Sequence, residues 1–233
     1  MKIKLLVLCV AILVLSGCGK TAEHEKTAGE FIRLIAEQNY EGTKALSSGK
    51  VLYNLSNADK KGLSPAAVLY MKVQTMAQSP NWSEVVATTK TDINGDVDIS
   101  WHRMSLSKTD GDWKVYKIEA VGPQLIGSGS ISQDDVKSAE AVFNDYIKSL
   151  AGNKQNSVQY LAGPARRSQE GSVVMLGSTP LFESVESASL TPLWQNKELL
   201  VCRADYMVDG RDVKVVVTFA RLNTWKIVEV SSS

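Results

Sequence analysis

The side chains that could carry acid–base chemistry are few and scattered. The chain has two histidines. His24 lies in a polar segment near the N-terminus, and His102 lies in the middle of the strand-like run 100–104. A general base must lie close to its proton and be desolvated enough to hold a useful pKa. His102 has neither a second histidine nor an alternating acidic residue beside it. The sequence therefore predicts no catalytic residue and favours a protein that is not an enzyme.

Acidic side chains occur in two patterns that indicate surface contacts. Asp205 lies two residues from Arg203 in a strand-like run, so both side chains share one face and predict a surface ion pair. Asp96 and Asp98 flank the turn signal Asn-Gly and lie on one face near its tip. A calcium loop would need more oxygen ligands at defined spacing. These residues therefore predict no metal site.

Motifs for metals, nucleotides and acyl transfer are missing from the sequence. It contains no Cys-x-x-Cys, His-x-x-x-His, Gly-x-Ser-x-Gly or phosphate-binding glycine loop with its lysine. Arg166 and Arg167 follow Gly163 and Pro164 at a predicted helix entry. They could meet an anionic group, although adjacent arginines are also common on solvated surfaces. The sequence predicts no cofactor and no metal.

The N-terminal residues have the three parts of a secretory signal. Lysines precede the apolar run 5–15, and small residues stand directly before Cys18. The run is too short to span a bilayer. Residues 15–18, Leu-Ser-Gly-Cys, resemble the lipobox of bacterial lipoproteins. The alternative is an ordinary secretory signal with a chance cysteine.

The lipobox resemblance implies where the chain is cut and anchored. Cleavage between Gly17 and Cys18 would remove the signal peptide 1–17, and the Cys18 thiol would carry a diacylglyceryl group. A thiolate can be alkylated where a serine hydroxyl cannot. Residues 18–26 would form a short lipidated tether to the membrane. The second mature residue, Gly19, is not acidic. The sequence thus predicts an exported protein anchored to the bacterial cell membrane or outer membrane.

Charge and cysteine content narrow the partners. The chain has 26 basic and 25 acidic residues, and loss of two lysines with the signal leaves 24 − 25 = −1. Without a basic patch, nucleic acid is not an expected partner. Cys9 would leave with the signal and Cys18 would carry lipid, so Cys202 would have no disulfide partner. In its strand-like run, Cys202 is predicted to be a small buried apolar side chain.

The remaining chain has one plan that occurs twice. Helical periodicity begins at Ala28 and again near Val136, and each half continues into strands separated by turn signals. The halves align at offsets of 146 − 31 = 115 near their starts and 225 − 113 = 112 near their ends. Chance agreement of apolar periodicity is the alternative. We therefore predict a signal 1–17, a tether 18–26, a first α+β domain 27–121, a linker 122–132 and a second α+β domain 133–233.

The order of elements resembles the nuclear-transport-factor-2-like fold, also called the cystatin-like cone. Gly-Asp-Trp-Lys-Val at 111–115 is the best local match to exported bacterial members. The resemblance implies N-terminal helices packed on a curved antiparallel meander sheet in each domain. It also implies a pocket between helix and sheet, where enzymes of this superfamily place an Asp, His or Tyr. Tandem domains of this kind occur in conjugation and secretion machines, where they bind neighbouring subunits.

The tryptophans indicate either core or partner contacts. Trp113 and Trp225 start equivalent last strands and are predicted to fill the cores. Trp82 and Trp194 lie at strand ends, where contact with a partner is expected. The sequence thus predicts a membrane-anchored envelope lipoprotein that binds a protein partner or supports assembly. The alternative is a small-ligand carrier or an enzyme that uses a cone pocket.

Overall fold

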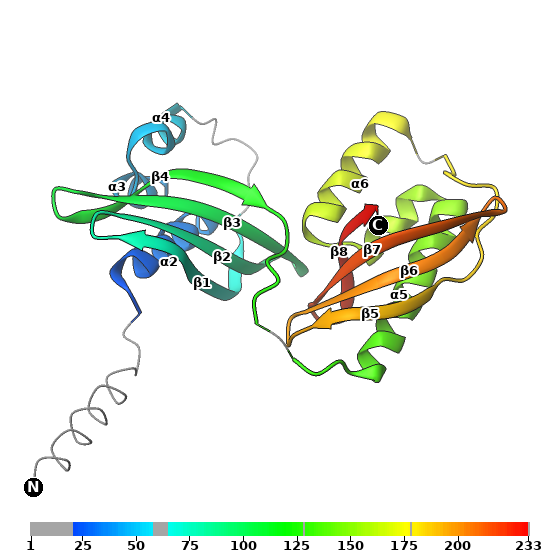
Figure 1. The fold of residues 1–233 in the computed structure, drawn as a ribbon. Helices are drawn as coiled ribbons and strands as arrows, with labels where there is room; N and C mark the ends of the chain where they lie inside the picture. The colour runs from blue at the N-terminus through cyan, green and yellow to red at the C-terminus, as the bar shows by residue number, and fades with distance from the viewer. Residues whose placement is uncertain (1–20, 58–64, 128, 178, 233) are drawn as a thin grey trace, which may run out of the picture.

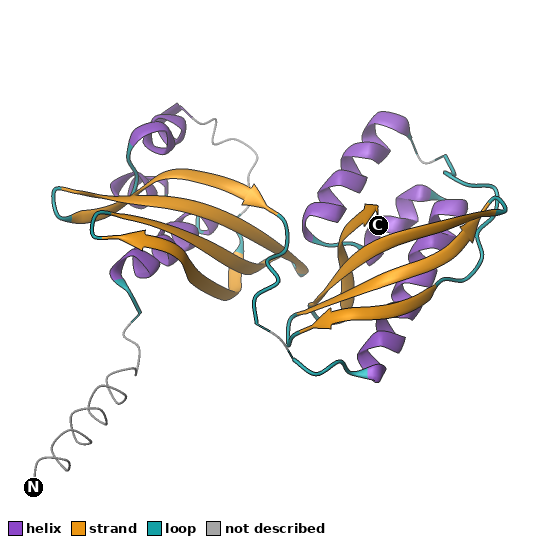
Figure 2. Ribbon diagram, viewed as in Figure 1, coloured by secondary structure: helices purple, strands orange, loops and turns teal. Residues whose placement is uncertain are grey.

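The computed structural model describes residues 21–57, 65–127, 129–177 and 179–232, and within them the chain forms two domains (Figure 1). Each domain begins with helices and continues into a four-stranded antiparallel sheet whose strands pair in sequence order. The helices cover one face of each sheet, as Figure 2 shows. The predicted α+β class with two small domains is confirmed.

The first domain has three described helices and one sheet. Its elements are α2 (Glu23–Ala36), α3 (Tyr40–Ala45), α4 (Gly49–Asn57), β1 (Ala67–Ser79), β2 (Trp82–Ile93), β3 (Asp96–Thr109) and β4 (Asp112–Val121). Helix α2 buries Ala28, Phe31 and Ile32 against the sheet. From the sheet, Val85, Ala87, Met104, Leu106 and Val115 complete this core. The helical and strand periodicities therefore meet in one apolar layer.

The second domain repeats this order. Its elements are α5 (Gln133–Ala151), the 3₁₀ helix η1 (Lys154–Tyr160), α6 (Gly163–Leu176), β5 (Ser189–Gln195), β6 (Leu199–Val208), β7 (Arg211–Arg221) and β8 (Trp225–Ser232). The predicted N-cap is confirmed, because Ser132 Oγ accepts a bond from Asp135 N at 3.3 Å. The core packs Phe143 and Ile147 of α5 against Phe219 and other sheet residues.

The hairpin turns follow the turn residues of the sequence. Asn94 and Gly95 have φ of 57° and 88°, and Asp209 and Gly210 have φ of 47° and 72°. Two successive residues in the left-handed region form the tight turn whose twist suits a two-residue hairpin. The β2–β3 and β6–β7 hairpins are therefore equivalent, with an offset of 209 − 94 = 115.

Further contacts recur at equivalent positions in both domains. Residue 47 forms a parallel bridge with Val115, and Leu161 forms one with Ile227. The next residue of each last strand is preceded by a lysine with the same role: Lys114 Nζ donates to the Ala45 carbonyl at 2.7 Å, and Lys226 Nζ donates to the Gln159 carbonyl. These repeated contacts give a structural basis for comparing the two domains position by position.

The predicted tether is shorter than expected at its folded end. Helix α2 begins at Glu23, so residues 23–26 belong to the first domain. His24 is buried, and its Nε2 lies 2.8 Å from Thr75 Oγ1. Glu25 accepts bonds from both the amide and the hydroxyl of Thr75. Polar composition suggested a tether here, whereas the polar side chains in fact bind the edge of β1.

The predicted linker is bound to the second domain along its described part. The Gly129 amide donates to the Gln195 carbonyl at 2.8 Å, and the Ser132 amide donates to Gln195 Oε1 at 2.8 Å. Glycine and serine content suggested a flexible connection. These bonds instead hold the chain between the domains against the β5–β6 turn.

Candidate binding site

The two domains share an apolar cluster. Ile99 and Trp101 lie on β3, on the sheet face opposite Met104 and Leu106, and each is 1% exposed. Their side chains pack with a set from the second domain: Ala162, Leu199, Ala220 and Val228. An outer sheet face of the first domain is therefore buried by the second domain, and burial of these apolar side chains stabilises the docked arrangement.

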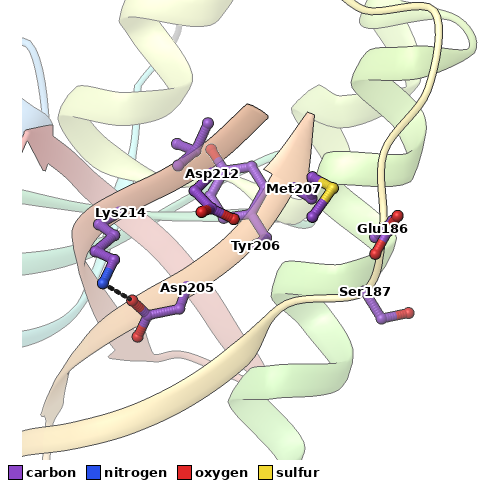
Figure 3. A pocket seen from close by; sticks show the side chains of 8 residues that line it. Glu186, Ser187, Asp205, Tyr206, Met207, Asp212 and Lys214 are labelled. Atoms are coloured by element: carbon purple, nitrogen blue, oxygen red, sulfur yellow. Dashed lines mark ion pairs between the residues drawn. The ribbon is translucent and has the colours of Figure 1, made fainter. Parts of the chain in front are cut away.

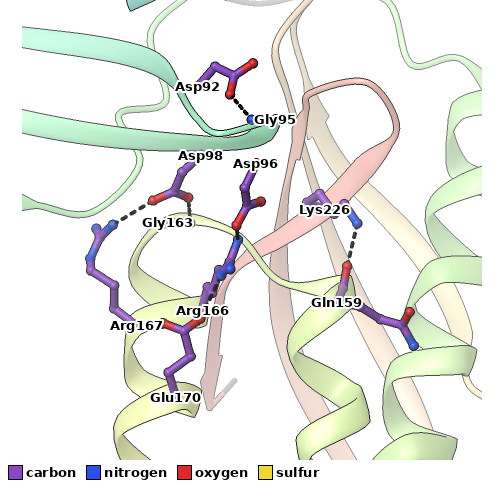
Figure 4. A network of polar contacts seen from close by, with 10 residues as sticks. All are labelled: Asp92, Gly95, Asp96, Asp98, Gln159, Gly163, Arg166, Arg167, Glu170 and Lys226. Atoms are coloured by element: carbon purple, nitrogen blue, oxygen red, sulfur yellow. Dashed lines mark hydrogen bonds and ion pairs between the residues drawn. The ribbon is translucent and has the colours of Figure 1, made fainter. Parts of the chain in front are cut away.

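Polar contacts flank this cluster at the start of α6 (Figure 4). Asp98 Oδ1 accepts a bond from the Gly163 amide at 2.5 Å, and Asp98 Oδ2 lies 3.2 Å from Arg167 Nη1. Asp96 Oδ2 lies 2.6 Å from Arg166 Nη1. A carboxylate at a helix N-terminus satisfies an otherwise unpaired amide and meets the positive end of the helix dipole. The anion that the two arginines meet is thus supplied by the first domain.

A lysine makes the second polar contact between the domains. Lys90 Nζ of β2 pairs with Glu198 Oε2 and also donates to the Arg221 carbonyl at 2.8 Å. The lysine side chain is 17% exposed, so this pair is shielded from solvent more than a typical surface pair. Together with the contacts at α6, it fixes the orientation of the second domain on the first.

His102 lies in β3 as predicted, without a catalytic partner. Its Nδ1 atom is buried and has no hydrogen-bond partner among the described residues. Burial and, second, the charge of Arg167 lower the pKa of His102. An isolated neutral imidazole with no acid or nucleophile beside it cannot pass a proton onward. The described residues also contain no group of three metal-ligating side chains.

A hollow of about 350 Å³ opens on the first domain between α2, α4 and β4. Apolar side chains make its floor: Phe31, Val51, Leu55 and Ile118. Charged and amide groups, Lys50, Asn54, Lys117 and Glu119, stand at its rim. We call this hollow the first-domain groove. An apolar floor with a few polar groups around it is the usual composition of a binding site.

The second domain has an equivalent hollow of about 260 Å³ between α5, α6 and β8. Gly49 and Gly163, with φ of 52° and 57°, start the equivalent helices at an offset of 163 − 49 = 114. At that offset, Ala165 and Gln169 replace Val51 and Leu55 of the first-domain groove. Tyr146 lines this second hollow, and burial raises the pKa of Tyr146 to about 12. The first-domain groove is therefore the more apolar of the two.

A further hollow, of about 330 Å³, lies beside the β6–β7 hairpin (Figure 3). Its lining is polar and includes Glu186, Asp205, Asp212 and Lys214. Asp205 lies 2.9 Å from the Arg203 guanidinium, which confirms the predicted ion pair, and 3.6 Å from Lys214. Each carboxylate oxygen of Asp205 thus faces a cation, and the arrangement provides no general base.

The structure gives each tryptophan a distinct place. Trp225 is buried in the second core, and Trp113 packs against the first. Trp82 is half-buried, with its Nε1 donating to Tyr116 Oη at 2.8 Å, and Trp194 packs against the interdomain cluster. Sequence periodicity identified the strands of these residues, but it could not show which sheet face a neighbouring domain covers. Contact of Trp82 and Trp194 with a partner stays a prediction.

The remaining predictions concern cysteines and membrane contact. Cys202 is free and buried, and burial raises the pKa of its thiol to about 12, as expected for an apolar side chain in the core. Gly17 and Cys18 lie outside the described residues, so cleavage and lipidation stay predictions. Within the described ranges, no helix combines the length and apolar character needed to cross a membrane.

Comparisons with known proteins extend little beyond the fold. No protein-family model matches the sequence, and no curated protein matches it. The structure is similar to a solved structure described as an "Ntf2 like protein involved in plasmid conjugation". That similarity has a TM-score of 0.34 and 10% sequence identity, over 89% of this chain and 94% of the other.

Proposed function

We propose that the protein is a membrane-anchored lipoprotein of the bacterial cell envelope whose first-domain groove binds a protein partner. The groove carries the proposal: Phe31, Val51, Leu55 and Ile118 form an apolar floor beside β4. β4 is the last strand of its sheet, and residues 46–48 occupy its open side at Val115. An extended partner segment could continue this pairing along 117–121 while one apolar side chain enters the groove.

The absence of a reaction centre among the described residues supports binding over catalysis. The hollow beside the β6–β7 hairpin has its carboxylates paired, and His102 has no partner. The docked domains offer a partner a preorganised surface, which lowers the ordering cost of binding. A lipid anchor at Cys18 would hold that surface close to the membrane, provided that more than one acyl chain is attached.

The binding proposal is tested with a groove variant. Leu55→Asp places a charge on the apolar floor, whereas Leu69→Asp changes a side chain that is already 56% exposed on β1. Anchored wild-type protein and both variants are purified from envelope membranes after crosslinking. We expect a stoichiometric protein partner that is lost with Leu55→Asp and kept with Leu69→Asp. A partner retained by both variants would show that the groove does not bind it.

The anchor is tested separately. Cys18→Ala should move the protein from the membrane fraction to the soluble fraction, and Cys9→Ala, in the predicted signal, should leave it in the membrane. Mass spectrometry of the mature N-terminus identifies the attached lipid. Equal membrane association of wild type and Cys18→Ala would refute the lipoprotein assignment.

A small apolar ligand is the second candidate, because the volume of the first-domain groove, about 350 Å³, is sufficient for one. Native mass spectrometry of the protein released from membranes distinguishes the two. A bound small molecule that is absent from Leu55→Asp would favour a carrier over a protein-binding module.

A further inference from the structure

Helix α6 has two sides, and the side turned away from its hollow docks on the first domain. Arg166 and Arg167 on this side meet Asp96 and Asp98 of the β2–β3 hairpin. At the offset of 114 set by the glycines that start α4 and α6, the equivalent residues of α4 lie at 166 − 114 = 52 and 167 − 114 = 53.

Those positions hold exposed apolar side chains on α4. Leu52 is 37% exposed and Tyr53 is 69% exposed. The first domain thus carries, on the equivalent side of its last helix, two large apolar residues that nothing in the described chain covers. An exposed apolar pair beside a helix start of this kind is a frequent feature of interaction surfaces. The internal interface indicates what kind of structure fits there: the face of a β-hairpin.

The second domain presents the equivalent hairpin at its far end. The pairing registers of β2–β3 and β6–β7 correspond at the offset of 115, since Lys90 pairs with Ile99 and Asp205 pairs with Lys214. Asp98 of the first hairpin therefore corresponds to Val213, which lines the hollow of Figure 3. This hairpin is the structural counterpart of the surface that the first domain offers to α6.

The chemistry of the two open surfaces has changed in a matched way. Inside the chain, Arg167 faces Asp98, an ion pair. At the open surfaces the same two positions hold Tyr53 and Val213, which are both apolar. A charge facing an apolar group would be unfavourable, but an apolar group facing another is not.

The second contact changes in the opposite direction. Inside the chain, Ile99 and Leu199 belong to the same apolar cluster. Their equivalents at the offset of 115 are Lys214 and, at 199 − 115 = 84, Glu84, which have opposite charges. Two contacts thus exchange their character while each stays complementary, and complementary charge arrangement favours one specific register.

We propose that copies of this chain associate head to tail, with α4 of one copy docked on the β6–β7 hairpin of the next. The long-range charge also agrees: α4 has Lys50 and no acidic residue in its first turn, whereas Glu186, Asp205 and Asp212 surround the hairpin. The contact joins unlike surfaces, so it can extend beyond two copies. It does not use the first-domain groove and goes beyond the proposed function.

The experiment uses the chain from residue 19 onward and measures its mass by sedimentation equilibrium. Concentrations reach about 1 mM, the effective concentration that short tethers produce. We expect the wild type to exceed the monomer mass in a concentration-dependent way. Tyr53→Arg and Val213→Asp should each weaken association at least about tenfold, which corresponds to about 1.4 kcal/mol.

Mixing the two variants gives the decisive result. The mixture offers an arginine on α4 of one chain to an aspartate on the hairpin of the other, as Arg167 and Asp98 do inside the chain. Association should therefore return to the wild-type level. Val174→Arg, at a position 86% exposed on α6, controls for added charge and should change nothing. A wild type that stays monomeric throughout, or a mixture no stronger than its components, would overturn the proposal. Circular dichroism confirms that each variant is folded.

Discussion

A methyl group at Gly163 should separate the two domains, because this glycine approaches the first domain too closely for a side chain. An ideal Cβ at Gly163 would lie 2.8 Å from the Ile99 carbonyl oxygen and 3.4 Å from Trp101 Cζ3. Gly49 starts the equivalent helix with nearly the same backbone, φ of 52° against 57°. Its Cβ would meet only Tyr116 Cβ, at 3.9 Å. The two glycines therefore form a matched pair that differs in the neighbouring domain.

The magnitudes follow from these contacts. An alanine in the left-handed region costs about 1 kcal/mol at either position. At Gly163 the colliding atom is a backbone carbonyl, which cannot rotate away, so the first domain must withdraw. Uncovering a large apolar side chain costs about 1.5–3 kcal/mol. We therefore expect Gly163→Ala to lower the free energy of unfolding by about 3 kcal/mol and Gly49→Ala by about 1 kcal/mol.

Urea unfolding measures these losses, and small-angle X-ray scattering measures the separation of the domains. Gly163→Ala should increase the radius of gyration, whereas Gly49→Ala should leave it unchanged. The urea transition of Gly163→Ala should also broaden or split, because undocked domains unfold independently. Equal losses from the two variants, with an unchanged radius of gyration in both, would refute the close packing of Gly163 against β3.

Three further predictions concern single groups. Asp98→Asn removes the charge facing Arg167 and weakens the bond from the Gly163 amide, so it should destabilise the docked state by about 1–2 kcal/mol; scattering and urea unfolding measure this, and an unchanged profile would contradict it. Burial lowers the pKa of His102 below 6.5, so the unfolded chain binds the proton more readily and stability should fall as pH drops through 6.5; His102→Gln should reduce this slope, measured by urea unfolding at pH 7 and 5. Cys202, with its thiol pKa near 12, should react with thiol reagents at pH 8 only through opening of the fold, and native labelling as fast as in urea would disprove its burial.

The sequence predicted the hairpins well because their turns are encoded locally. Asn94 with Gly95 and Asp209 with Gly210 take positive φ, and flanking alternation then fixes which residues face the core. The four strands of the second domain were predicted in this way. Strand β1 (Ala67–Ser79) was missed, because it lies at the edge of its sheet and most of its side chains are exposed or half-buried. Its alternation is correspondingly weak.

The interface between the domains could not be predicted from local patterns. Arg166 with Arg167 and Asp96 with Asp98 were each recognised as charged pairs, but nothing in the sequence indicates that they meet. Alternation in β3 shows two apolar faces, and Trp101 suits either a domain core or a covered outer face. A long-range contact of this kind depends on the three-dimensional approach of segments that are more than 60 residues apart, as with Asp98 and Gly163.

The docked domains change what a membrane tether would accomplish. A flexible linker would let each domain search for a partner separately, and binding would then incur the entropy of ordering both. The bonds of Lys90 to Glu198 and of Asp98 to Gly163 remove that freedom before any partner arrives. The first-domain groove and the β6–β7 hairpin are therefore held at a fixed separation and orientation, which favours a repeating partner or a second copy over an unstructured one. Undocking by Gly163→Ala should consequently weaken head-to-tail association only where it requires both surfaces at once, in assemblies larger than two copies.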